Sequence, residues 1–262
     1  MRIITYNVNG VRSALRKNLA AYIEQSHADI FCLQESKAQP GQFDRELFRF
    51  MGYQDYWHSA ERKGYSGVGI ISKTPPREVV YGCGVPEFDA EGRVMRADWD
   101  ELSVLSLYLP NGTSGEIRQQ FKMDFCHFFR DYVQSLLQKQ PQLVVCGDFN
   151  ICHQPIDIHD PVRNAQNSGF LPEERDWVSS FLSMGMVDGF RAVHPDRVQY
   201  SWWSFRAQAR KNNKGWRIDY HMVSAALAGR IENCFYDTNA HHSDHCPGVL
   251  DLDMPGGGSS LQ

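Results

Sequence analysis

The run from Leu143 to Asn150 constrains the fold more than any other stretch of this chain, because it joins an apolar strand to polar side chains. It begins with Leu, Val, Val and Cys, a pattern that predicts a buried strand. Side chains two apart on a strand share a face, so Asp148 and Asn150 would point the same way at the strand's end. Open α/β sheets bind ligands at that edge, although Asp and Asn also favour ordinary turns.

Other segments along the chain also combine a short apolar run with polar residues, at 3–9, 29–35, 104–111 and 243–250. Carboxylates, amides, a phenol and an imidazole supplied by several strand ends are typical of a site that holds a hard cation and acts on phosphate esters. Together with the run at 143–150, these segments supply Asn7, Glu35, Tyr108, Asn111, Asp148, Asn150, Asp244 and His245.

Length and composition fit one globular domain. The chain has 262 residues, a size that a single α/β core supports, and we expect that domain to span 1–254.

No apolar run approaches the roughly 18 residues needed to cross a bilayer, and the N-terminus enters a strand without the apolar stretch of a signal peptide. These features predict a cytoplasmic, nucleoid-associated protein without membrane contact. The Gly- and Ser-rich tail at 255–262 is expected to be disordered.

The cysteines are scattered and form no C-x-x-C pair. Several lie in apolar runs, which predicts reduced thiols that act as small core residues. A zinc site is not expected, because the usual ligand spacings are missing. The residues are Cys32, Cys83, Cys126, Cys146, Cys152, Cys234 and Cys246.

A basic run at 206–217 stands out against the net charge of −4, because it contains no acid. Trp202, Trp203, Phe205 and Trp216 lie around it. Cations that contact phosphates, interleaved with rings that stack on bases, suit nucleic-acid binding. A solvated basic loop with core aromatics at its ends would give the same pattern.

Strands and helices alternate along the chain, which predicts sheets covered by helices. One helix is expected at 12–26, and a capping box at 113–116 predicts the start of a long helix whose Ile117 and aromatic residues recur at steps of three and four. A helix followed by a strand that ends in an acid occurs at 12–35 and again at 114–148, which suggests two similar halves. Further strands are expected near 53–58, 66–72, 93–99, 102–108, 186–190, 218–223, 230–236 and 247–253.

Short motifs lie in order along nearly the whole chain, at 7–10, 33–35, 64–69, 91–93, 108–112, 147–150, 215–220 and 243–247. The most distinctive are Tyr-Leu-Pro-Asn-Gly and Gly-Trp-Arg-Ile-Asp-Tyr. Together the motifs resemble the exonuclease III type of abasic-site endonuclease, within the wider endonuclease, exonuclease and phosphatase superfamily. The resemblance implies a four-layer α/β sandwich, with two mixed β-sheets packed face to face and helices on both outer faces.

The resemblance also implies an enzyme that hydrolyses double-stranded DNA on the 5′ side of abasic sites and trims 3′ ends. It implies Mg²⁺ or Mn²⁺ as cofactor, with one or two ions, and we expect a monomer that needs no protein partner. The balance between endonuclease and exonuclease activity stays open. Two rival functions are a phosphatase of the same superfamily that acts on a lipid or inositol phosphate, and a DNA-binding module that has lost catalysis.

We expect the cation to be held mainly by Glu35, because a hard cation prefers carboxylate oxygen and keeps several waters. Asp244 is the expected second ligand, direct or through water, with Asn7 and Asn9 nearby. The remaining candidates for the ligand set are Asp148, Asn150 and His245.

Two assignments of the catalytic base remain open. In one, Asp148 orients and deprotonates the attacking water, and Asn150 holds that water or a phosphate oxygen. In the other, His245 is the base and Asp148 is a metal ligand. His245 and Asp219 are expected to pair, because a carboxylate fixes the imidazole tautomer and favours the protonated ring. The other groups expected at the scissile phosphate are Tyr108 and Asn111.

For substrate recognition, the resemblance implies an apolar pocket that accepts a flipped-out abasic sugar, whose extrusion costs less because it has lost its base. Arg206 falls where family members insert a side chain into the duplex. The segment 158–162 departs from the family pattern, with an acid and an apolar residue where an amide and a cation are common, which would shift preference toward 3′ ends. The pocket residues are Trp202, Trp216 and Ile218, and the loop residues near the flipped nucleotide are Asn164 and Asn167.

Overall fold

The strands pair into two six-stranded mixed sheets. The computed structural model describes residues 1–254, so the tail expected to be disordered lies outside the described residues. In spatial order, the first sheet contains β11 (Ile231–Tyr236), β12 (Gly248–Leu252), β1 (Arg2–Asn7), β2 (Ile30–Gln34), β4 (Val68–Ser72) and β3 (Gln54–His58). The second contains β5 (Glu78–Tyr81), β6 (Val94–Asp98), β7 (Ser103–Tyr108), β8 (Leu143–Asp148), β10 (Asp219–Ser224) and β9 (Met186–Asp188).

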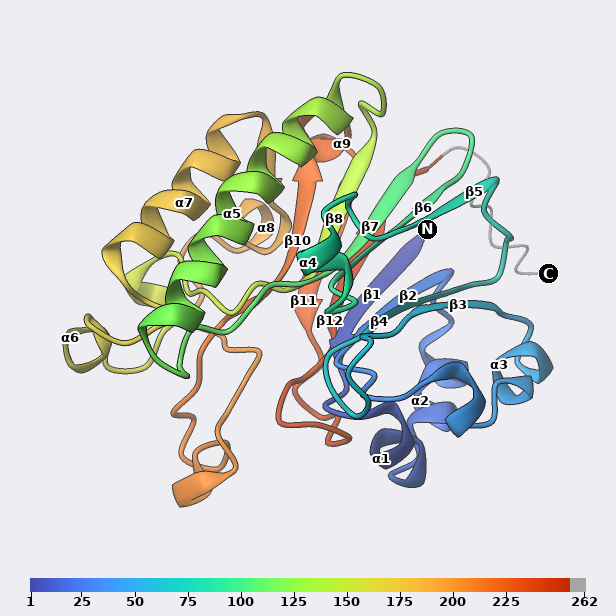
Figure 1. The fold of residues 1–262 in the computed structure, drawn as a ribbon, viewed down its shortest axis with the longest axis horizontal. Coiled ribbons are helices and arrows are strands. Elements are labelled where there is room, and N and C mark those ends of the chain that lie inside the picture. Colours follow the sequence, from blue (N-terminus) through green and yellow to red (C-terminus); the bar gives the residue numbers. More distant parts are fainter. Residues whose placement is uncertain (255–262) are drawn as a thin grey trace.

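Helices cover the outer face of each sheet, and apolar side chains fill the space between the sheets (Figure 1). Ile3 and Ile70 of the first sheet belong to the same buried cluster as Val104 and Val144 of the second. This arrangement confirms the predicted four-layer α/β sandwich. The first sheet is covered by α1 (Val11–Arg16), α2 (Leu19–Ser26) and α3 (Glu46–Phe50), and the second by α5 (Glu116–Leu137) and α7 (Pro172–Ser183).

Short helical segments occupy the connections between these elements. Among residues 1–254, no helix combines the length and the apolar character needed to cross a membrane. The short segments are η1 (Pro40–Gln42), α4 (Pro86–Asp89), η2 (Pro155–Asp157), α6 (Pro161–Asn164), α8 (Gly189–Val193), η3 (Arg206–Gln208) and α9 (Ala225–Ala228).

The two sheets share one pairing pattern. Each has a parallel pair at its centre, β1 with β2 and β7 with β8, and helical segments connect the two strands of each pair. An antiparallel pair lies on either side: β11 with β12 and β3 with β4 in the first sheet, and β5 with β6 and β9 with β10 in the second. Because parallel strands end at the same edge, each central pair delivers the residues that follow it to one edge of the sandwich.

Local structure departs from the sequence prediction in several places. The helix expected at 12–26 is two helices, because Asn18 adopts a left-handed conformation with φ 72° between them. No side-chain hydrogen bond caps α5, so the predicted capping box is wrong, and Ile117 is 91% exposed rather than packed on the core. The strand expected at 186–190 ends at Asp188, whose carboxylate accepts hydrogen bonds from the first turn of α8.

All seven cysteines are unpaired, and all except Cys83 are buried. Cys32 and Cys146 lie in the core between the sheets. The prediction of free thiols that act mainly as small core residues is therefore confirmed.

Candidate active site

The ends of both central strand pairs meet at one edge of the sandwich. Tyr108, Asp148 and Asp219 are direct register partners on β7, β8 and β10. Asn7, at the end of β1, donates through Nδ2 to Glu35 Oε1 and to Asp148 Oδ2, each at 2.8 Å. This buried amide therefore joins the two sheets at the point where their acids converge.

The backbone at this edge adopts conformations that are uncommon in proteins. Glu35 and Asn150, each shortly past a strand, have φ values of 51° and 52°, in the left-handed region that few non-glycine residues occupy. Gly147 has a φ of 150°, and a Cβ there would lie 1.8 Å from the carbonyl oxygen of Leu107. Non-glycine residues in such conformations cost about 1–3 kcal/mol each and cluster at functional sites.

His245 is held by Asp219. The two side chains of this expected pair are in contact, with His245 Nδ1 2.9 Å from Asp219 Oδ2. The same carboxylate oxygen accepts a hydrogen bond from Ser201 Oγ at 2.6 Å. Burial lowers the pKa of His245, but the carboxylates of Asp219 and Asp148 outweigh this effect and raise the pKa to about 10. The imidazole is therefore protonated at neutral pH.

Asp148 lies buried at the centre of the site. Its Oδ1 accepts a hydrogen bond from the backbone N–H of Asn150 at 2.8 Å, and its Oδ2 lies 3.8 Å from His245 Nε2. Burial raises the pKa of Asp148 to about 7, with His245 acting against the rise and Asp219 and Glu35 adding to it. A carboxyl that titrates near neutral pH is suited to general acid–base chemistry.

A line of contacts connects Glu35 to Asp244. Lys37 Nζ lies 2.6 Å from Glu35 Oε2 and donates to Asn9 Oδ1 at 2.6 Å, while Asn9 Nδ2 donates to Asp244 Oδ1 at 2.9 Å. Burial would raise the pKa of both acids, but neighbouring cations and donors outweigh it. The pKa of Glu35 and that of Asp244 therefore lie below their ordinary values, and both side chains are ionised at neutral pH.

Tyr108, Asn111 and Asn150 line the same pocket as these acids. Asn111 Nδ2 donates to Asn150 Oδ1 at 3.1 Å, and Asn150 Nδ2 donates to the carbonyl of Leu109 at 2.8 Å. Burial, reinforced by the carboxylate of Glu35, raises the pKa of Tyr108 well above its ordinary value, so the phenol keeps its proton. A neutral phenol and an amide can both donate to a phosphate oxygen.

An apolar surface forms part of this pocket, whose volume is about 340 Å³. Trp202, Trp216 and Ile218 line it together with the acids and amides. The two indole rings pack edge to face with their centroids 5.8 Å apart. Ile158 and Phe170 are buried in the same apolar cluster and support the pocket from within. The structure thus brings the predicted sugar-pocket residues to the predicted catalytic groups.

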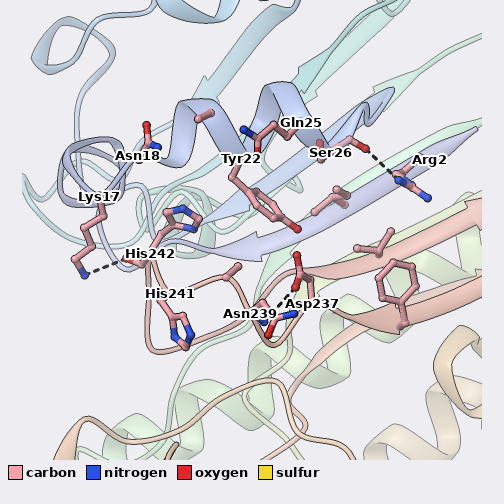
Figure 2. Close-up of a pocket in the computed structure, with 15 residues that line it drawn as sticks. Arg2, Lys17, Asn18, Tyr22, Gln25, Ser26, Asp237, Asn239, His241 and His242 are labelled. Atoms are coloured by element: carbon pink, nitrogen blue, oxygen red, sulfur yellow. Dashed lines mark hydrogen bonds between the residues drawn. The ribbon is translucent and has the colours of Figure 1, made fainter.

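A second, larger cleft of about 580 Å³ lies between α2 and the segment that precedes β12 (Figure 2). Arg2, Tyr22, Asp237 and His242 are among the residues that line it. Lys17 Nζ donates to the carbonyl of His242 at 3.1 Å across one end of the cleft. The acids from the strand ends line the smaller pocket, so size alone does not identify the reactive site in the described part of the chain.

The other predicted DNA contacts lie on loops rather than in the pocket. Arg206 is exposed in the loop before β10, and this orange loop projects on the same side of the molecule as α6 (Figure 1). Near α6, Asn167 Nδ2 donates to Asn164 Oδ1 at 2.8 Å, and Asn164 Nδ2 donates to the carbonyl of His159 at 3.0 Å. Contact of these residues with DNA stays a prediction.

The chemistry of the donor set fits a hard divalent cation. Glu35, Asp148 and His245 each offer one potential ligand atom, and these atoms lie within 4.8 Å of one another. Carboxylate oxygen suits Mg²⁺ and Mn²⁺, whereas an imidazole must lose its proton before it can bind a metal. Glu35 and Asp148 are therefore the strongest candidate ligands, with Asp244 connected to them through Asn9.

Sequence inspection assigned no role to two cations that hold the site, although one of them lies in the motif at 91–93. Lys37 follows Glu35 at a spacing of two, and this Glu-x-Lys pattern after a strand is its only local signal. Arg93 lies over the Tyr108 ring, with its guanidinium carbon 4.7 Å from the centroid, and donates to the Tyr108 carbonyl at 3.0 Å. Arg93 is 15 residues from Tyr108 along the chain, so only the fold brings them together.

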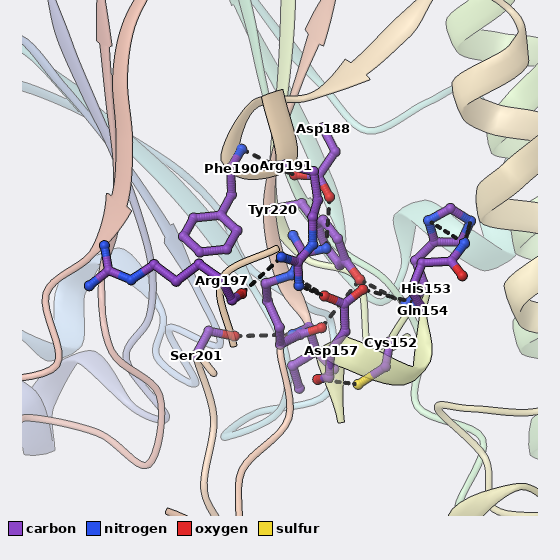
Figure 3. A network of polar contacts seen from close by, with 12 residues as sticks. Cys152, His153, Gln154, Asp157, Asp188, Phe190, Arg191, Arg197, Ser201 and Tyr220 are labelled. Carbon is purple, nitrogen blue, oxygen red and sulfur yellow. Dashed lines mark hydrogen bonds and ion pairs between the residues drawn. The ribbon is translucent and has the colours of Figure 1, made fainter. Parts of the chain in front are cut away.

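A second group of charges, here called the balanced cluster, is buried among the residues that Figure 3 draws. It consists of Asp157, Asp188, Arg191 and Arg217. Arg217 Nε lies 2.7 Å from Asp157 Oδ1 and its Nη2 lies 2.8 Å from Asp188 Oδ2, and Arg191 also pairs with Asp157. Arg217 is fully buried, so its assignment to the DNA-binding basic run is wrong. The cluster instead anchors the start of β10, which carries Asp219.

Known proteins share both this sequence pattern and this fold. The endonuclease/exonuclease/phosphatase family matches residues 4–245. An exodeoxyribonuclease from Bacillus subtilis is 43% identical over 97% of this chain and 100% of its own length. The structure of an AP endonuclease from Archaeoglobus fulgidus gives a TM-score of 0.90 at 30% identity, over 97% of this chain and 100% of that one. A 3′ phosphatase from Neisseria bound to a product DNA hairpin gives the same TM-score and coverage at 28% identity.

Proposed function

The chain belongs to the endonuclease/exonuclease/phosphatase family, and we propose that it is a DNA-repair phosphodiesterase that cuts on the 5′ side of abasic sites and trims 3′ ends, with Mg²⁺ or Mn²⁺ as cofactor. The observation that carries the proposal is the convergence of Glu35, Asp148 and the His245–Asp219 pair beside an apolar pocket. The nuclease and phosphatase relatives described above support it.

Charge explains the need for a cation. Carboxylates outnumber cations in this pocket, so an anionic phosphodiester would be repelled by the empty site. A bound divalent cation would neutralise the excess negative charge of the carboxylates and polarise a phosphoryl oxygen. Glu35 and Asp148 would hold the ion, with Asp244 as a further ligand. Asn7 would keep Glu35 and Asp148 in place through its two hydrogen bonds.

Of the two candidate bases, Asp148 fits better than His245. The raised pKa of His245 keeps the imidazole protonated at neutral pH, so it is already an acid. Its Nε2 can donate to a phosphoryl oxygen while Asp219 holds Nδ1. Asp148 can accept the proton of an attacking water, which Asn150 would help to orient. The remaining donors, Tyr108 and Asn111, would bind the phosphate or assist the departing 3′ oxygen.

The apolar pocket and the loops around it would recognise the damaged nucleotide. Trp202, Trp216 and Ile218 offer ring and aliphatic surface on which a sugar without a base can pack. Arg206 would enter the duplex, and the loop that carries Asn164 and Asn167 would contact the backbone near the extruded nucleotide. Every group in this scheme comes from one chain, so we propose that the enzyme acts as a monomer on double-stranded DNA.

A comparison of three DNA substrates tests the proposal. The purified protein would be incubated with Mg²⁺ and a duplex that carries an internal abasic analogue, a nick with a 3′ phosphate, or an undamaged recessed 3′ end. We expect cleavage or trimming of at least the first two, and its loss in EDTA. If all three stay intact, or EDTA has no effect, the proposal is wrong. Release of phosphate from an inositol phosphate instead would identify the rival phosphatase function.

A further inference from the structure

We propose that Trp202 is a positioning residue for the cation site as well as a wall of the sugar pocket. Its indole N–H donates to Asp244 Oδ2 at 3.0 Å, so one side chain contacts both the pocket and a carboxylate that faces the site. The inference rests on the proposed function, because it takes Asp244 to be a cation ligand.

The Asp244 carboxylate is held at both oxygens, and Trp202 holds one of them alone. Asn9 Nδ2 and Ser243 Oγ donate to Oδ1 at 2.9 and 3.1 Å. Within residues 1–254, the Trp202 indole is the sole hydrogen-bond donor to Oδ2. Because separate donors hold the two oxygens, the plane of the carboxylate is fixed. Loss of the indole N–H would leave the carboxylate held at Oδ1 alone, and its Oδ2 less firmly oriented.

The backbone connects the same two segments. Trp202 forms isolated β-bridges with both Trp216 and His245, and the backbone N–H of Trp203 donates to the carbonyl of Asp244 at 3.0 Å. The Trp202 backbone therefore cannot shift relative to the Asp244–His245 segment without breaking main-chain hydrogen bonds. This rigidity makes the indole a fixed support for the carboxylate.

Groups that orient a metal ligand from behind commonly change metal affinity by about 10- to 100-fold when they are removed. Trp202 has this position relative to Asp244, whereas Trp216 does not. Trp216 lines the same pocket, but its indole nitrogen has no hydrogen-bond partner in the part of the chain that the structure describes. The two tryptophans therefore form a matched pair for an experiment.

The test compares W202F with W216F by titration calorimetry of Mg²⁺, and separately of Mn²⁺, into the DNA-free protein. Each variant keeps an aromatic ring in the pocket and loses one indole N–H. We expect W202F to weaken cation binding by about tenfold, and W216F to change it less than twofold. The Mg²⁺ concentration for half-maximal cleavage should rise in parallel for W202F alone.

Equal cation affinity in W202F and the wild type would overturn the inference. Failure of the wild type to bind either cation would instead contradict the cation site of the proposed function, and the two failures are therefore distinguishable. If W202F does not fold, replacement of Trp202 by 3-benzothienylalanine keeps the shape of the ring and substitutes sulfur for the N–H. The same tenfold loss is expected there, and an unchanged affinity would overturn the inference.

Discussion

Two groups of charged side chains meet at the start of β10, and they differ in the balance of positive and negative charge. In the balanced cluster, Arg217 and Arg191 pair with Asp157 and Asp188. In the other, here called the acid-rich cluster, the carboxylates outnumber the cations. The acid-rich cluster consists of Glu35, Asp148, Asp219, Asp244, Lys37 and His245.

This difference separates a structural role from a chemical one. Each charge in the balanced cluster has a partner, so the main effect of a change there is an uncompensated buried charge and a less stable fold. In the acid-rich cluster the pKa of Asp148 is raised to about 7, and we expect an added cation to stabilise the cluster. Changes in the two clusters should therefore affect different measurements.

The largest effect is expected from D148N, which keeps the shape of the side chain but removes the proposed base. Cleavage of an abasic-analogue duplex should fall by about 10²–10⁴-fold, the usual contribution of general acid–base catalysis. Single-turnover rates with Mg²⁺ measure this, and fluorescence anisotropy should show that duplex binding is largely kept. D131N, which changes an exposed acid on α5, is the control. A D148N rate within fivefold of the wild type would remove Asp148 as the base.

In the balanced cluster, R217M should reduce the free energy of unfolding by about 3–5 kcal/mol, because it leaves the Asp188 carboxylate without an ionic partner and Asp157 with Arg191 alone. Urea denaturation monitored by tryptophan fluorescence gives this value. The matched control is R130M, which removes an exposed pair with Asp131 and should cost at most about 1 kcal/mol. Similar losses in the two variants would show that the cluster does not anchor the fold.

Addition of Mg²⁺ should stabilise the protein through the acid-rich cluster. At a concentration 100-fold above its Kd, a ligand that binds only the folded state adds about 2.7 kcal/mol to the free energy of unfolding. Urea denaturation with and without Mg²⁺ measures the increment. It should fall to about 1.4 kcal/mol or less in E35Q, because loss of the proposed main ligand weakens binding by at least about tenfold. An increment that E35Q leaves unchanged would place the bound ion elsewhere.

The dependence of stability on pH should differ in sign between the two clusters. The raised pKa of His245 contributes stability that is fully present below its ordinary value of 6.5 and is lost as pH rises through about 10. Asp148 acts in the same direction between 3.8 and about 7. At Asp157, Arg217 and Arg191 outweigh burial and lower the pKa, so its contribution is present above 3.8 and is lost in acid.

Urea denaturation of the metal-free protein between pH 6.5 and 9.5 checks the alkaline part of this prediction. The free energy of unfolding should fall across that range, and the fall should be smaller in H245Q. H127Q, which replaces an exposed histidine of α5, should follow the wild type. A slope that H245Q leaves unchanged would show that His245 is not the group responsible.

Strand-end patterns in the sequence predicted much of the acid-rich cluster, because its acids follow apolar runs that parallel strands carry to one edge. Glu35 and Asp148 are examples. The balanced cluster gave no such signal, since its pairs join residues far apart in sequence, as Arg217 and Asp157 show at a separation of 60. The basic run predicted that Arg217 would be exposed on a DNA-binding surface, whereas it is buried. A run of basic residues in the sequence does not reveal which of its members is buried.

Local errors in the fold have equally specific causes. Asn18 interrupts the first predicted helix because its backbone is left-handed, and the spacing of apolar residues does not predict such a conformation. Ile117 fits the periodic face of α5 but lies in its first turn, beyond the edge of the core, and is exposed. Periodicity therefore indicated which face of a helix packs, while the ends of the helix depended on the surrounding fold.

The most direct test of the central claim, that the acid-rich cluster is the cation-dependent catalytic centre, is a Mg²⁺ titration of abasic-duplex cleavage by the wild type and E35Q. We expect the wild type to saturate with Mg²⁺ and to lose activity in EDTA. E35Q should need at least about tenfold more Mg²⁺ and cleave more slowly, with duplex binding retained. Identical titration curves for the two proteins would contradict the account.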